Sequence, residues 1–178
     1  MFGRMRRERQ LKSQARTLYN AIMGLVRRPE IYRDMGVPDT FEGRFEVLAL
    51  VTCLVLRRLR GGGEAVRPLA QTLVDTLFDD MDIVLREAGI SDTALSKKAR
   101  TMASAFYGRA KAYDEAFAAD GEAALCAALA RNVLGEASRD AGALSAFVRA
   151  LEQALAAWSV GELAEGHLPP TGMASAAA

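Results

Sequence analysis

The chain has 178 residues, of which 51% are hydrophobic and 25% charged, and its formal net charge at pH 7 is +1. This composition is typical of one soluble globular domain and excludes disordered, collagen-like and disulfide-scaffold proteins. The near-zero net charge disfavours a strongly basic nucleic-acid-binding protein. The alanine content favours helix.

Two cysteines and one histidine limit the chemistry that the chain can perform. Cys53 and Cys126 each stand in an apolar run, so both are expected to be small core residues rather than a disulfide pair. His167 lies in a C-terminal segment that contains two consecutive prolines. Most zinc sites and all His-based catalytic triads or dyads are thereby excluded. The longest apolar stretch, residues 47–56, is too short to span a membrane, which takes about 20 residues.

Apolar side chains at helical spacing predict about six helices and no strands. The first covers residues 9–28, and Pro29 either stops it or begins a short helix over 30–35. The second, over 41–59, is apolar on several faces and is therefore expected to be central. Three glycines at 61–63 end it and form a linker, because no Lys-Ser/Thr follows to make a phosphate loop.

The remaining helices follow from the same spacing. The third covers residues 68–87, and Ser96 is expected to cap a fourth that reaches Phe117. Asp120 caps a fifth, with apolar positions up to Val133, and the sixth covers 144–158. We therefore expect an all-α, single-domain bundle around an apolar central helix. Its parts would be a basic extension (1–10), a helical domain (11–165) and a disordered tail (166–178).

Three features carry candidate chemistry. The acidic run at residues 79–82 resembles the magnesium–diphosphate motif of isoprenoid synthases, but Ile83 stands where its last aspartate is required. Gly108, in the middle of a helix, is expected to allow a close approach by a neighbouring helix. The arginine-rich start would attract RNA or anionic lipid phosphate, or would be a solvated, disordered end; its arginines are Arg4, Arg6, Arg7 and Arg9.

An ordered set of short segments between about residues 18 and 134 resembles the ubiquinol–cytochrome c chaperone family, the assembly factors of ubiquinol–cytochrome c reductase. The matching pieces are Tyr32, residues 36–40 and 43–45, Gln71, Asp75, Phe78, residues 80–82 and 85–87, Gly89, Asp92, residues 106–109 and Tyr113.

The resemblance implies a chaperone rather than an enzyme, with newly synthesised cytochrome b as its client. In a bacterium it would act at the cytoplasmic face of the inner membrane, as a peripheral protein; in a eukaryote it would act in the mitochondrial matrix. From the residues themselves we expect no metal or organic cofactor. The ribosome and the anionic membrane surface are further candidate partners, and DNA is not.

We expect the client groove to include apolar and polar side chains of the third and fourth helices: Phe78, Met81, Phe106, Tyr107, Arg109 and Tyr113. A polar core would support it, made of Arg44, Asp75, Asp80, Asp82 and Arg86. In this core, Arg44 or Arg109 is predicted to form a salt bridge to Asp75, Asp80 or Asp82. The alternative functions are a small magnesium-dependent enzyme acting on a prenyl diphosphate through residues 79–82, and a ribosome- or RNA-binding adaptor.

Overall fold

The predicted all-α fold is confirmed. The computed structural model describes residues 2–119, 121–135 and 139–168, and these contain helices and no strand. The eight α-helices and one 3-10 turn are α1 (Phe2–Val26), α2 (Pro29–Asp34), α3 (Phe41–Arg60), η1 (Gly63–Ala65), α4 (Arg67–Glu87), α5 (Asp92–Ala118), α6 (Ala123–Asn132), α7 (Gly142–Ala157) and α8 (Val160–Ala164).

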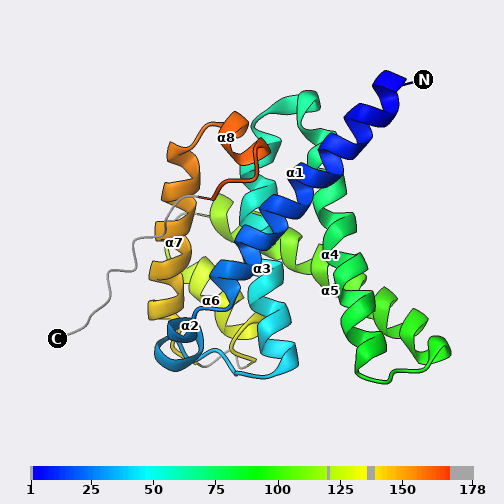
Figure 1. The fold of residues 1–178 in the computed structure, drawn as a ribbon. Coiled ribbons are helices and arrows are strands. Elements are labelled where there is room, and N and C mark those ends of the chain that lie inside the picture. Colours follow the sequence, from blue (N-terminus) through cyan, green and yellow to red (C-terminus); the bar gives the residue numbers. More distant parts are fainter. Residues whose placement is uncertain (1, 120, 136–138, 169–178) are drawn as a thin grey trace.

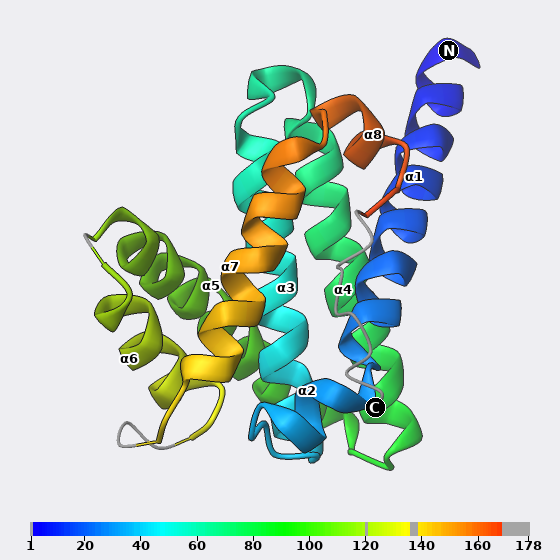
Figure 2. The same cartoon turned by 90° about the vertical axis from the view of Figure 1, so that its left-hand side faces the viewer.

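Helix α3 lies at the centre of the bundle, where it contacts α1, α4, α5, α7 and α8 (Figures 1 and 2). It starts at Phe41 because Thr40, in an extended conformation, accepts a hydrogen bond from the backbone N–H of Gly43 at 3.1 Å. Twelve of its twenty residues are buried, more than in any other helix described. Its charged side chains are therefore confined to its two ends.

The starts of two helices differ from the prediction. Helix α1 begins at Phe2 rather than near Arg9, because Arg, Met and Gln are good helix formers and nothing breaks the run. Helix α5 begins at Asp92 after an extended Ser91, one turn before the predicted cap Ser96. The short helix at residues 29–34 forms. The predicted cap Asp120 and residues 169–178 of the predicted tail lie outside the described residues.

Helix α8 was not predicted, although its start carries a recognisable signal. Ser159 and Glu162 form a reciprocal capping box, in which each side chain accepts a hydrogen bond from the backbone N–H of the other residue. The turn after α8 crosses α1 at Gly166, which is buried and has φ +88°. A Cβ atom there would lie 2.6 Å from the Thr17 side chain, so only glycine fits this crossing.

Candidate functional site

Three aromatic rings connect the core to the surface between α4 and α5. The rings of Phe78 and Phe106 meet edge to face with centroids 5.7 Å apart, and those of Phe106 and Tyr107 meet in the same way at 5.5 Å. Phe106 is buried, Phe78 is half-buried and Tyr107 is 58% exposed. Tyr107 is therefore a large aromatic side chain fixed by ring contacts on its inner side and open to a partner on its outer side.

The proposed client-binding residues do not all reach the surface. Met81, Phe106 and Tyr113 are buried core residues, and burial raises the pKa of the Tyr113 hydroxyl well above its usual value. Only Phe78, Tyr107 and Arg109 of that set have accessible side chains. In this conformation a partner would touch these three and not the others.

Gly108 does not serve the close helix packing that we expected. It is exposed, and a Cβ atom built on it would have no neighbour within 4 Å outside its own helix. The helix therefore carries a glycine that costs about 1 kcal/mol relative to alanine without an internal contact that requires it. The result is a gap in the side-chain layer immediately beside Tyr107.

Arg109 forms a two-point ion pair with Glu46, which ties α5 to α3. The guanidinium Nε and Nη2 donate to the two carboxylate oxygens at 2.9 and 2.8 Å. The side chains are only 28% and 16% exposed, and the hydrogen bonds to Glu46 raise the pKa of Arg109. The prediction that Arg109 pairs with an aspartate of α4 is wrong, because the side chain leaves α5 on the side that faces α3.

The predicted partner of Arg44 is also wrong. Arg44 pairs at 2.7 Å with Asp39, five residues earlier, and its guanidinium lies 4.8 Å from the centre of the Tyr32 ring. Both charged side chains of this pair are about half-exposed. Arg44 thus pairs with Asp39, in the connector just before α3, and not with a carboxylate of α4.

The aspartates of α4 bind partners that the sequence did not indicate. Asp80 accepts a hydrogen bond from the Tyr19 hydroxyl at 2.7 Å and lies 3.4 Å from Arg16, both on α1. Burial, and to a lesser extent the hydrogen bond to Asp80, raises the pKa of the Tyr19 hydroxyl. Asp80 therefore fixes α1 against α4, rather than α4 against α3 or α5.

The other polar residues predicted on α4 form local contacts. Asp82 and Asp92 both pair with Arg86, at 2.7 and 2.9 Å, and Asp75 accepts a hydrogen bond from Gln71. Asp80 and Asp82 of the acidic run thus bind partners on different sides of α4. Among the described residues, no three potential metal ligands lie close enough together to hold a metal ion. A diphosphate–magnesium site has no support in this geometry.

The thiol of Cys53 is also unsuited to nucleophilic chemistry. Both cysteines are free, and burial raises the pKa of Cys53 to about 12, which keeps it protonated at neutral pH. His167 is exposed beside Glu165, at 3.9 Å.

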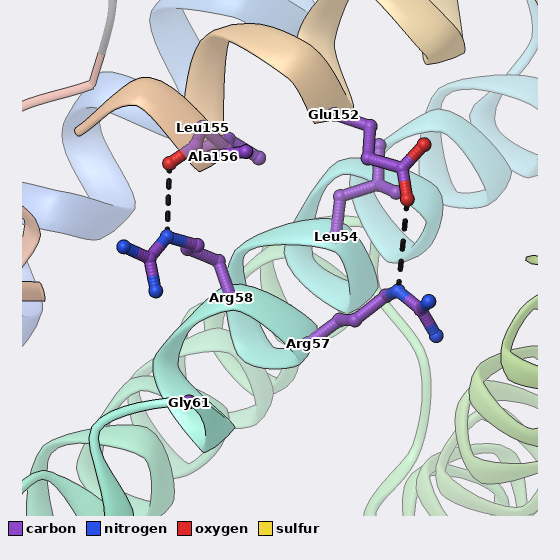
Figure 3. A pocket seen from close by; sticks show the side chains of 7 residues that line it. All are labelled: Leu54, Arg57, Arg58, Gly61, Glu152, Leu155 and Ala156. Carbon is purple, nitrogen blue, oxygen red and sulfur yellow. Dashed lines mark hydrogen bonds and ion pairs between the residues drawn. The ribbon is translucent and has the colours of Figure 1, made fainter. Parts of the chain in front are cut away.

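A cleft of about 230 Å³ lies between α3 and α7 and was not foreseen from the sequence (Figure 3). Leu54, Leu155 and Ala156 supply its apolar surface. The Arg58 guanidinium beside it donates to the carbonyl oxygens of Leu155 and Trp158 at 3.0 and 2.7 Å, which caps the end of α7. Small-molecule sites usually enclose about 300–1,000 Å³, so this cleft fits a single apolar side chain better than a substrate.

The four arginines predicted to contact a ribosome or membrane all lie on the first turns of α1 and are exposed: Arg4, Arg6, Arg7 and Arg9. They lie on a helix rather than in an irregular extension. In the described part of the chain, no helix has the length and apolar character needed to cross a bilayer.

Comparison with known proteins identifies a family whose model matches this chain and a solved structure with a similar fold. The family model described as ubiquinol-cytochrome C chaperone matches residues 33–169. The solved structure of the Cbp3 homolog from Brucella abortus has a TM-score of 0.81 and 34% sequence identity, and the match covers 95% of this chain and 96% of that one.

Curated relatives include two proteins named ubiquinol-cytochrome c reductase complex assembly factor 1. That of Xenopus laevis is 27% identical over 130 residues, which are 73% of this chain and 64% of the relative. That of Mus musculus is 25% identical over 130 residues, 73% of this chain and 44% of the relative. The chain thus spans less than two thirds of the length of these relatives.

The Arg109–Glu46 pair should contribute measurably to stability. We expect Arg109→Ala to lower the free energy of unfolding by about 1–3 kcal/mol, because it leaves the Glu46 carboxylate mostly buried without a partner. A double-mutant cycle with Glu46→Ala, followed by urea denaturation, measures the coupling. The exposed Arg44–Asp39 pair is the control and should give less than about 1 kcal/mol. Equal coupling energies for the two pairs would contradict this assignment.

Proposed function

Because the chain belongs to the ubiquinol–cytochrome c chaperone family, we propose that it is a chaperone that binds newly synthesised cytochrome b and supports assembly of ubiquinol–cytochrome c reductase. The names of the curated relatives, which describe assembly factors of that reductase, support the second part. The description of the family as a chaperone supports a binding role over catalysis.

The observation that carries the proposal is the outward face of α5 at Tyr107 and Gly108. A client with transmembrane helices presents apolar side chains before they are buried in lipid or in a complex. Tyr107 can cover such side chains with its ring while its hydroxyl remains hydrated. Its ring contact with Phe106 reduces the entropy that it would lose on binding.

Gly108 complements Tyr107 as a contact point. The empty position beside the exposed ring would let the backbone of a client helix approach α5 closely, as small residues do at helix–helix interfaces in membranes. Phe78 extends the surface onto α4. The half-buried Arg109, held by Glu46, fixes the orientation of α5 and so acts as a positioning residue.

Replacing Tyr107 tests the surface directly. We expect Tyr107→Ala to weaken capture of cytochrome b made in a cell-free translation system by about tenfold or more, as for a truncated aromatic anchor. The melting temperature should change little, because most of the ring is exposed. Ile83→Ala is the matched control: Ile83 is 51% exposed on α4 but lies five residues, about 140°, from Phe78 around that helix. Normal capture by a folded Tyr107→Ala variant would place the client elsewhere.

Gly108→Ala separates binding from stability. The substitution should stabilise the fold by about 0.5–1 kcal/mol, since alanine is the better helix former and no atom opposes its Cβ. It should nevertheless weaken cytochrome b capture, because the methyl group fills the gap. Gly24→Ala, at an exposed position of α1 that is equally free of neighbours, should leave capture unchanged. A Gly108→Ala variant that is more stable and captures normally would rule out close approach at this point.

A further inference from the structure

The first turns of α1 extend beyond the rest of the bundle. In both views the N-terminal end of this helix passes the ends of its neighbours (Figures 1 and 2). Residues 3–10, here called the N-terminal arm, are all exposed, whereas Ala15, Leu18 and Ile22 further along the helix are buried. At the positions that continue this buried stripe, the arm carries Arg4 and Arg7. The stripe therefore changes from apolar to basic at the point where the helix leaves the bundle.

The charge of the arm is not neutralised by the protein itself. The only acidic side chain of the arm, Glu8, lies 3.4 Å from Lys12. Among the described residues, no carboxylate is within ion-pair distance of the four arginines of the arm: Arg4, Arg6, Arg7 and Arg9. Further along α1 the situation differs, because Arg16 pairs with Asp80. The uncompensated positive charge is thus concentrated on a part of the molecule that extends past its neighbours.

The arm extends from a firmly held helix. The Tyr19 hydroxyl donates to Asp80 at 2.7 Å, and the turn at Gly166 packs directly on Thr17. The arginines are thus presented at fixed spacing, and ordering them on a charged surface costs less conformational entropy than ordering a flexible tail.

We propose that the N-terminal arm binds the surface of an anionic lipid bilayer and holds the chaperone there. A flat anionic surface meets the protruding arm first. The acidic side chains Asp75 and Asp79 are set back from its tip, in a cleft between α4 and α1 that begins at Glu8 of the arm. Met5, half-exposed among the arginines, adds an apolar contact at the headgroup level. RNA fits less well, because residues 3–18 contain no aromatic side chain on which a base could stack.

The test uses the whole chain and no client, so its outcome does not depend on cytochrome b binding. Vesicles of phosphatidylcholine with about one third phosphatidylglycerol should bind the protein at low salt and release it as ionic strength rises toward about 0.5 M. Replacing Arg4, Arg6, Arg7 and Arg9 by glutamine should weaken partitioning by about a hundredfold or more, because each basic residue near the surface contributes about 1 kcal/mol.

A control variant removes the same charge elsewhere. Glutamine at four exposed basic positions away from the arm, none of them in an ion pair with another described residue, should leave vesicle binding largely unchanged; these positions are Arg27, Lys97, Arg100 and Arg131. Circular dichroism checks that both variants keep the helical content. Equal loss in the two variants, or binding of the parent to pure phosphatidylcholine, would overturn the proposal. Sedimentation with ribosomes but not with anionic vesicles would overturn it too and assign the arm to ribosomal RNA.

Discussion

The apolar character of α3 is the constraint from which the polar contacts of the bundle follow. Residues 47–55 are buried and α3 touches five other helices, so the middle of the helix can hold no charge. Its polar contacts with other helices are made near its ends. Glu46 binds Arg109 of α5 near the start, and near the end Arg57 lies 3.3 Å from Asp114 of α5 while Arg58 caps α7. Helix α5 is therefore attached to α3 at two points, Arg109 and Asp114, which are five residues apart on α5.

This double attachment determines which face of α5 is free. With Arg109 and Asp114 engaged by α3, Phe106 and Tyr113 face the core. Successive residues of an α-helix are rotated by about 100°, so Gly108 lies about 160° from Phe106 and faces outward. Tyr107 lies at the edge of the core-facing side, on the side of Asp114, and its ring is 58% exposed. The outward position of Gly108 is thus a consequence of packing, although no internal contact needs a glycine there. A surface feature that costs stability and has no internal role is where a binding function is expected.

The sequence predicted the helices better than their contacts. Apolar residues on several faces identified the central helix, because only a helix surrounded by others can bury them all. Ion-pair partners depend on how helices cross, which spacing along one helix does not encode. Arg109 therefore pairs with a glutamate on α3 instead of an aspartate on α4, and Asp80 binds α1. The capping signal of α8, by contrast, is present in the sequence as Ser159 and Glu162, three residues apart. The exposure of Tyr107 could not be read from the sequence, since tyrosines at helical spacing are as often buried, as Tyr113 is.

Site-specific photo-crosslinking measures most directly whether the α4–α5 surface receives the client. A photoreactive phenylalanine analogue placed at position 107 should form an adduct with cytochrome b during its synthesis, because Tyr107 projects from α5 into the proposed contact. The same analogue at Gln153, an exposed position on α7, should give little adduct. Strong crosslinking at 107 with little at 153 is the result that this account predicts. Efficient crosslinking at 153 with none at 107 would contradict it.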